Sequence, residues 1–108
     1  LTILQWYRHA KLRLQVAFAE EQVRIFETMR VKALTGSPHE AAEAWRYAEW
    51  YYPSGTKQDA DSRLDKVVET VRSNTIHEIK RYLLSHTSND IGNNPSNWID
   101  YLNKPGQA

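Results

Sequence analysis

The sequence has no cysteine, and only four glycines and four prolines among its 108 residues. The absence of thiols excludes disulfide bonds, cysteine-based zinc sites and thiol nucleophiles. No apolar run approaches the roughly twenty residues that a membrane-spanning helix needs. Hydrophobic residues make up 41% and charged residues 25%, fractions typical of ordinary globular domains. We therefore expect a single folded domain over residues 1–108.

The charge balance is close to neutral but unevenly distributed. Fourteen Lys and Arg against thirteen Asp and Glu give a net charge of +1, far from the basic excess typical of nucleic-acid binding. Nucleic acid is therefore not an expected partner. Residues 1–19, however, contain Arg8, Lys11 and Arg13 and no carboxylate before Glu20. That stretch alone is basic.

The first third of the chain has the pattern of one long helix. Between Thr2 and Leu34 there is no proline or glycine, and apolar residues recur at intervals of three, four or seven. A helix over residues 2–34 would extend about 45 Å at a rise of 1.5 Å per residue. A domain of this size does not need such length, so we expect the N-terminal end to project.

Start and stop signals divide the rest of the chain. Gly36 is suited to the left-handed conformation that closes a helix, and Ser37, Pro38 and Glu40 form a capping box around a first-turn proline. Further breaks are predicted at Pro53-Ser54-Gly55 and before Asn94-Pro95. The predicted helices span residues 2–34, 38–51, 59–86 and 95–102.

The connections between these predicted helices are short, and short connections favour antiparallel packing of consecutive helices. The predicted fold is therefore all-α: an antiparallel bundle of three main helices, with a long first helix and a helical hairpin, plus a short C-terminal helix. Trp45 and Tyr52, seven residues apart, are assigned to its core. Trp98, Ile99 and Leu102 are assigned to the inward face of the last helix.

Candidate catalytic or metal-binding groups are scarce. The four histidines share no i,i+4 spacing, and the Glu-x-x-His step of helical iron carboxylate proteins is missing. His77, with Glu78 and Arg81, forms a cluster typical of a solvated helix surface. We therefore predict no catalytic residue, no metal site and no cofactor, and a protein that is not an enzyme.

Aromatic residues are concentrated in the second helix. Between Trp45 and Tyr52 there are too many rings for one helix face to bury. Tyr47, Trp50 and Tyr51 are therefore candidate partner-binding residues, since exposed aromatics are preferred in contact surfaces. The alternative is that the first and last helices cover both sides of this segment.

The start of the chain suggests the neighbourhood of a membrane. Apolar residues come first, then Trp6 and Tyr7, then Arg8, Lys11 and Arg13, the order found at the cytoplasmic end of a transmembrane helix. These five residues are candidate membrane-proximal residues. Because the chain opens with Leu rather than Met, we expect an upstream segment that reaches the membrane. The alternatives are a frayed amphipathic start or a stripe for self-association.

Two stretches resemble known proteins. Residues 41–65, with Trp45, Trp50 and the Tyr52-Pro53 turn, resemble a planctomycete-type family of uncharacterised bacterial proteins with one N-terminal membrane anchor. The same stretch resembles half of a tetratricopeptide (TPR-like) hairpin, although the 34-residue repeat is not present. Residues 82–98 are similar to the closing element Leu-Thr-Gly-x-Asp-x-Gly-x-Asp-Pro-x-x-Trp of bacterial helical-repeat proteins. Ser88 stands there in place of Gly, and Asn94 in place of Asp.

Neither stretch contains a catalytic group, so the resemblance implies a helical interaction module tethered to a membrane. Together with the basic, aromatic start, it leads us to expect a non-enzymatic interaction or structural module at the cytoplasmic face of a membrane, with a protein partner or a second copy as its ligand. The alternative function is a peptide- or small-ligand-binding module that uses an aromatic groove.

Overall fold

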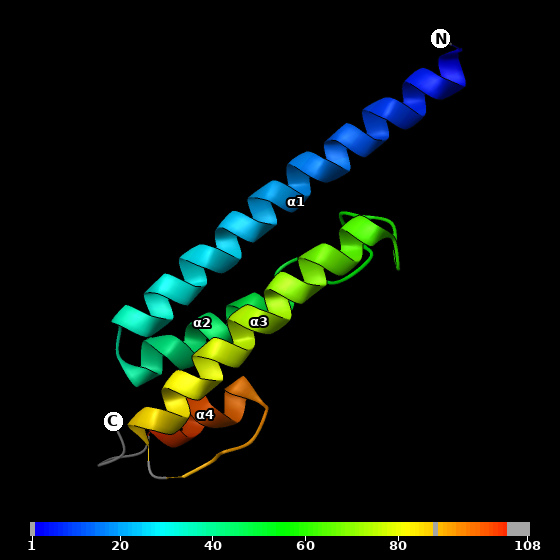
Figure 1. The fold of residues 1–108 in the computed structure, drawn as a ribbon. Helices are drawn as coiled ribbons and strands as arrows, with labels where there is room; N and C mark the ends of the chain where they lie inside the picture. The colour runs from blue at the N-terminus through cyan, green and yellow to red at the C-terminus, as the bar shows by residue number, and fades with distance from the viewer. Residues whose placement is uncertain (1, 88, 104–108) are drawn as a thin grey trace.

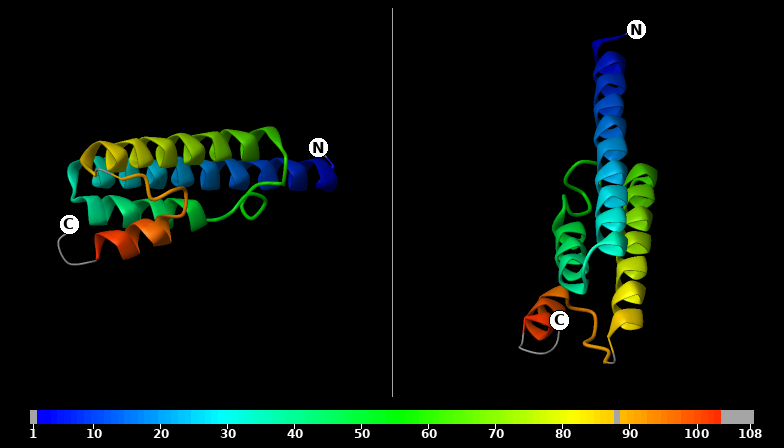
Figure 2. Two further views of the ribbon diagram at one scale, coloured as in Figure 1. Left: turned by 90° about the horizontal axis from the view of Figure 1, so that it is seen from below. Right: turned by 90° about the vertical axis from the view of Figure 1, so that its left-hand side faces the viewer.

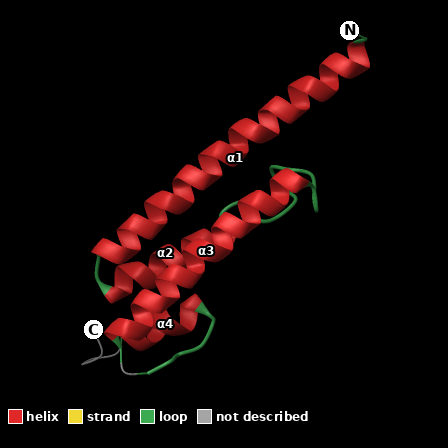
Figure 3. Cartoon of the chain, viewed as in Figure 1, coloured by secondary structure: helices red, strands yellow, loops and turns green. Residues whose placement is uncertain are grey.

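The computed structural model describes residues 2–87 and 89–103, and within these ranges it is entirely helical, without strands. Its helices are α1 (Ile3–Thr35), α2 (Pro38–Trp50), α3 (Arg63–His86) and α4 (Pro95–Leu102). Consecutive long helices run in opposite directions (Figures 1 and 3). The predicted all-α bundle, with a long first helix and a short last one, is confirmed.

The three long helices pack on one another, and α4 packs on α2 (Figure 2). The core contains two fully buried indole rings, Trp45 and Trp98. Trp98 also donates a hydrogen bond from Nε1 to the carbonyl of Gly92, at 2.9 Å, which ties α4 to the loop before it. Ile99 and Leu102 are buried beside it, as predicted.

The caps of α2 and α4 lie where the sequence places them, but the predicted capping box at Ser37 is only half formed: Glu40 Oε1 accepts from the Ser37 hydroxyl, at 3.4 Å, and not from the Ser37 N–H. Ser37 Oγ accepts a hydrogen bond from the Glu40 N–H at 3.2 Å, and Asn94 Oδ1 accepts one from the Ser96 N–H at 3.0 Å. Each helix has proline in its first turn. These side chains satisfy N–H groups that have no partner within the helix.

The third helix begins later than predicted, at Arg63 rather than near residue 59. Asp61 has a φ of 61°, which is incompatible with a right-handed helix. Ser62 is the N-cap, and its Oγ accepts from the Asp65 N–H at 3.1 Å. A capping serine followed three residues later by an acid is the sequence signal that marks this start.

Two further predictions are wrong. Gly36 is not left-handed: its φ is −103° and its ψ is −168°. Glycine is required there for space, because a Cβ would lie 2.8 Å from the carbonyl oxygen of Lys32. Tyr52 is not a core residue, since it is 44% exposed. Its backbone, at a φ of 43°, turns the chain out of α2.

The N-terminal part of α1 projects beyond the other helices (Figure 1), as its predicted length required. Every residue from Ile3 to Leu14 is exposed, and the first buried residue of α1 is Ala19. We call residues 3–14 the N-terminal arm. A capping box closes its tip: Thr2 Oγ1 accepts from the Gln5 N–H at 3.2 Å, and Gln5 Oε1 accepts from the Thr2 N–H at 3.1 Å.

Candidate interaction surfaces

The N-terminal arm carries large apolar side chains that nothing in the described chain covers. Ile3, Tyr7 and Leu14 follow one another along one side of the helix and are exposed, as is Trp6, at 64%. Further along α1, the buried Gln22 and Phe26 point roughly a quarter to a third of a turn away from this stripe, at about 100° per residue. The stripe is therefore not a continuation of the core-facing side of α1.

The arm is also positively charged. Lys11 forms an ion pair with Asp59, with its Nζ 3.4 Å from Oδ1. Arg8 and Arg13 form no ion pair with any described residue. The candidate membrane-proximal residues thus lie together on one exposed segment that combines two aromatic rings with three cations.

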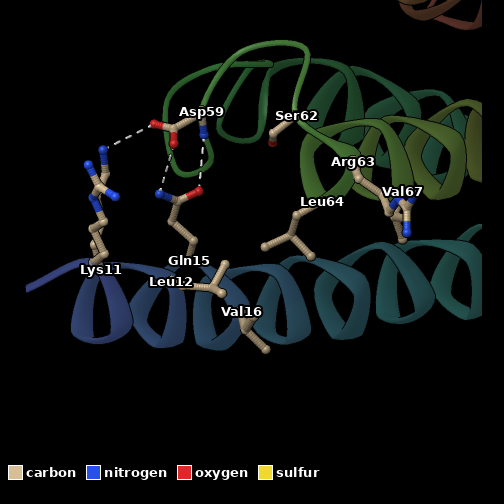
Figure 4. Close-up of a pocket in the computed structure, with 10 residues that line it drawn as sticks. Lys11, Leu12, Gln15, Val16, Asp59, Ser62, Arg63, Leu64 and Val67 are labelled. Carbon is tan, nitrogen blue, oxygen red and sulfur yellow. Dashed lines mark hydrogen bonds and ion pairs between the residues drawn. The ribbon is translucent and has the colours of Figure 1, made fainter. Parts of the chain in front are cut away.

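A groove that the sequence did not predict runs between the base of the arm and the start of α3 (Figure 4). We call it the α1–α3 groove, and its cavity volume is about 580 Å³. Its floor is apolar and its rim contains three cations and one carboxylate. The floor residues are Leu12 and Val16 from α1 and Leu64 and Val67 from α3; the charged residues are Arg8, Lys11, Arg63 and Asp59.

The end of the α1–α3 groove at Asp59 is fixed by hydrogen bonds. Gln15 Oε1 accepts from the Asp59 N–H at 3.1 Å, and Gln15 Nε2 donates to Asp59 Oδ2 at 3.4 Å (Figure 4). The carboxylate of Asp59 is therefore already bound by Gln15 and Lys11. Arg8 and Arg63 remain as the rim charges without a carboxylate partner among the described residues.

The predicted aromatic residues are only partly brought together. Trp50, 71% exposed, and Tyr47, 49% exposed, line a second groove with Met29 and Lys32 of α1, which we call the α1–α2 groove. Tyr51 does not line it. The Tyr51 ring is half-buried, with its centroid 5.5 Å from that of Tyr47, in a stacked arrangement.

Burial raises the pKa of the Tyr51 phenol, and the nearby negative charge of Glu21 raises it further. The ring also meets Phe26 edge-on, with centroids 6.0 Å apart. Tyr51 is thus a neutral packing group between α1 and α2. Of the three predicted partner-binding residues, Trp50 and Tyr47 have accessible rings in a groove.

The loop between α2 and α3 is held by a buried arginine that the sequence analysis missed. Arg72 Nη2 donates to the carbonyl oxygens of Tyr51 and Tyr52, at 2.5 and 2.6 Å, and Nη1 donates to Glu69 at 2.9 Å. The guanidinium also lies over the Phe26 ring, 5.2 Å from its centroid. A cation here satisfies carbonyls at the C-terminal end of α2 and complements the dipole of that helix.

Asp65 anchors the other side of the same loop. Burial alone would raise its pKa, but hydrogen bonds from Ser54 Oγ and from the N–H groups of Gly55 and Asp61, with the charge of Arg72, hold its pKa below the usual value. The first two bonds measure 2.5 and 3.0 Å. These bonds favour the carboxylate form.

Two buried glutamines complete the attachment of the loop. Gln58 Nε2 donates to Gln22 Oε1 at 2.8 Å and to the Gln15 carbonyl at 3.3 Å. Gln22 Nε2 in turn donates to the Tyr52 carbonyl at 3.4 Å. A polar side chain gives no sequence signal of burial unless its partner is known, which is why these contacts were not predicted.

The described residues contain no cluster of potential metal ligands. Across residues 2–87 and 89–103, no three His, Cys, Asp or Glu side chains lie together as they would to hold a metal ion. His77 is exposed, and its neighbour Glu78 lies 3.6 Å from Arg30. None of the four described helices is long and apolar enough to cross a membrane.

Over residues 2–87 and 89–103 the protein is thus a helical bundle with a projecting arm, and the α1–α3 and α1–α2 grooves are among its surface pockets. No protein-family model, curated protein or solved structure matches the sequence.

Proposed function

We propose that the protein is a non-enzymatic helical interaction module whose N-terminal arm contacts the cytoplasmic face of a membrane. One observation carries the proposal: the arm projects with Trp6, Tyr7, Arg8, Lys11 and Arg13 all exposed. Exposed apolar patches of this kind mark contact surfaces. Tryptophan and tyrosine prefer the headgroup region of a bilayer, and basic residues are attracted to its anionic lipids.

The resemblance of residues 41–65 to membrane-anchored bacterial proteins belongs to the same proposal. An anchor upstream would place the arm next to the lipid headgroups, and the body, which consists of the packed part of α1 with α2, α3 and α4, would stand away from the surface. The α1–α2 groove, and the part of the α1–α3 groove that α3 contributes, would then face partners in the cytoplasm.

The proposal is tested by flotation of the full chain with vesicles. Vesicles of phosphatidylcholine with phosphatidylglycerol should carry the protein upwards, whereas pure phosphatidylcholine should not. Each basic residue near an anionic surface contributes about 1 kcal/mol, so reversing Arg8, Lys11 and Arg13 to Glu should weaken binding by at least about a hundredfold.

A matched control reverses three other exposed cations, Arg46, Lys66 and Arg81, and so changes the net charge equally. This control should retain more binding than the arm variant. Equal loss in both variants would mean that overall charge, not the arm, attracts the protein. If the wild-type chain does not float with anionic vesicles, the proposal is rejected.

The α1–α2 groove supports a second candidate function, the binding of a peptide or small ligand. The observation that favours it is the exposure of Trp50, 71%, beside Tyr47 and Met29, since aromatic rings in a concave site are typical of ligand contacts. A thermal-shift screen of short peptides and aromatic compounds tests it. Stabilisation that Trp50→Ala removes supports this function, and the absence of any stabilising compound argues against it.

A further inference from the structure

We infer that the α1–α3 groove binds an acidic amphipathic helix of a partner protein. The inference rests on the proposed interaction function and adds a second contact surface with a partner of defined chemistry. The α1–α3 groove shares Arg8, Lys11 and Leu12 with the base of the arm and takes the rest of its lining from residues 15–16 and 59–67.

The lining of the groove favours a helical ligand. Leu12 and Val16 are one turn apart on α1, and Leu64 and Val67 are one turn apart on α3. Two helices side by side form a trough into which the apolar side chains of a third helix, spaced three or four residues apart, can insert. A peptide bound as a strand would need an exposed sheet edge, and the described residues contain no strand.

The apolar floor of the groove is accessible to solvent. Val67 is 51% exposed, although it lies on α3 next to the fully buried Val68. The lining residues of α1 extend from Arg8 to Val16, about 12 Å along the helix axis. That length accommodates roughly two turns of a bound helix.

The rim determines the charge of the ligand. Arg8, Lys11 and Arg63 surround the apolar floor, and the single carboxylate, Asp59, is held by Lys11 and Gln15. Ser62 also lines the groove and caps α3, so the positive end of that helix dipole faces the same opening. A ligand with glutamates beside its apolar stripe would be attracted to this rim.

The same charges argue against a second copy of the chain as the occupant. Its N-terminal arm is the exposed apolar helix it could offer, and insertion would place Arg8, Lys11 and Arg13 of one copy against the basic rim of the other. Like charges brought together at an interface oppose binding. The groove therefore fits an acidic partner helix better than it fits the protein itself.

The test uses a fluorescent peptide of about 18 residues, five helical turns, with leucines on one face and glutamates and alanines elsewhere. One control peptide has the same composition with scattered leucines. Another has lysine in place of every glutamate. Anisotropy should rise with the acidic amphipathic peptide alone, and added salt should weaken its binding.

Protein variants locate the binding site. Val67→Glu places a charge on the apolar floor and should raise the peptide Kd by about tenfold or more. Leu84→Glu is the matched control, since Leu84 is 40% exposed on the same helix and does not line the groove. It should leave the Kd unchanged. Arg63→Glu should weaken binding, and the exposed Arg81→Glu should not.

Three results would overturn the inference: no binding of the acidic peptide, equal binding of the lysine peptide, or equal effects of Val67→Glu and Leu84→Glu. A concentration-dependent dimer of the free protein that Val67→Glu abolishes would show that a second copy occupies the groove instead. Vesicles are absent from this assay. Failure of the peptide test therefore leaves the flotation result unaffected, and failure of flotation leaves the peptide result unaffected.

Discussion

Removal of the Arg72 side chain should be among the most destabilising changes in this chain. Arg72 is 7% exposed, and its guanidinium donates to two backbone carbonyls, those of Tyr51 and Tyr52. Hydrogen bonds that involve a charged group contribute about 1.5–3 kcal/mol each. Arg72→Ala also leaves Glu69, its half-buried partner, without a counter-charge, and breaking a buried pair costs about 3–5 kcal/mol.

These two contributions overlap, and water can reach the vacated site from the nearby surface, so we expect a loss of about 3 kcal/mol in the free energy of unfolding. Urea denaturation followed by circular dichroism measures it. With a typical dependence on urea of 1–3 kcal/mol per molar, the midpoint should fall by roughly 1–3 M. A loss of about 3 kcal/mol is a large part of the free energy of unfolding of a typical folded domain, which is about 5–15 kcal/mol.

Arg72→Lys separates geometry from charge. One ammonium group cannot reproduce the fork that reaches both carbonyls and Glu69, so this variant should lose roughly half as much stability as Arg72→Ala. Arg81→Ala, at an exposed position of the same helix, should change stability by less than about 0.5 kcal/mol. If Arg72→Ala and Arg81→Ala cost the same, the attachment of the loop through Arg72 is refuted.

Two further changes test other parts of the fold. The pKa of Asp65 is lower in the folded chain than the ordinary value of 3.8. The Asp65 carboxylate therefore stabilises the fold fully above pH 3.8, and this stabilisation is lost as the pH falls through the folded-state pKa. Asp65→Asn should therefore be less stable than wild type at neutral pH, with a difference that shrinks on acidification; a constant difference in urea titrations across pH would contradict this. Gly36→Ala should lower the free energy of unfolding by about 1–3 kcal/mol. The added Cβ would press on the Lys32 carbonyl oxygen, although alanine can adopt the backbone φ of this position. An unchanged thermal midpoint for Gly36→Ala would show that the connection relaxes freely.

The helices could be predicted from the sequence because their ends carry local chemistry. Ser37 before Pro38, and Asn94 before Pro95, act within one turn, so neighbouring residues suffice to identify them. The projection of α1 was predictable for a related reason. An unbroken helix of this length exceeds what one small core can cover.

The features that were missed depend on partners distant in sequence. Gln22 and Gln58 are buried because they bond to each other across 36 residues, and neither has a sequence pattern that indicates burial. Tyr52 has the spacing of a core residue but lies where the chain leaves α2. The α1–α3 groove depends on how far α3 extends along α1, which the predicted start near residue 59 misjudged.

Trp50 and Tyr47 are exposed, as an excess of aromatic residues on one helix suggests, but Tyr51 was grouped with them without knowledge of Phe26. The Tyr51 ring packs on Phe26 instead of facing the α1–α2 groove. The number of aromatic residues in this helix indicates that some of the rings are exposed. Which ones are exposed depends on the neighbouring helix.

The most direct test of the account is amide hydrogen exchange of the full chain with and without anionic vesicles. In the free protein, residues 3–14 should exchange much faster than the packed part of α1 around Phe26, because a projecting helix is supported by local hydrogen bonds alone. Added vesicles should slow exchange in the arm and leave α2 unchanged. Unchanged exchange in residues 3–14, with protection appearing around Tyr47 and Trp50 instead, would contradict the assignment of the arm as the membrane-contact surface.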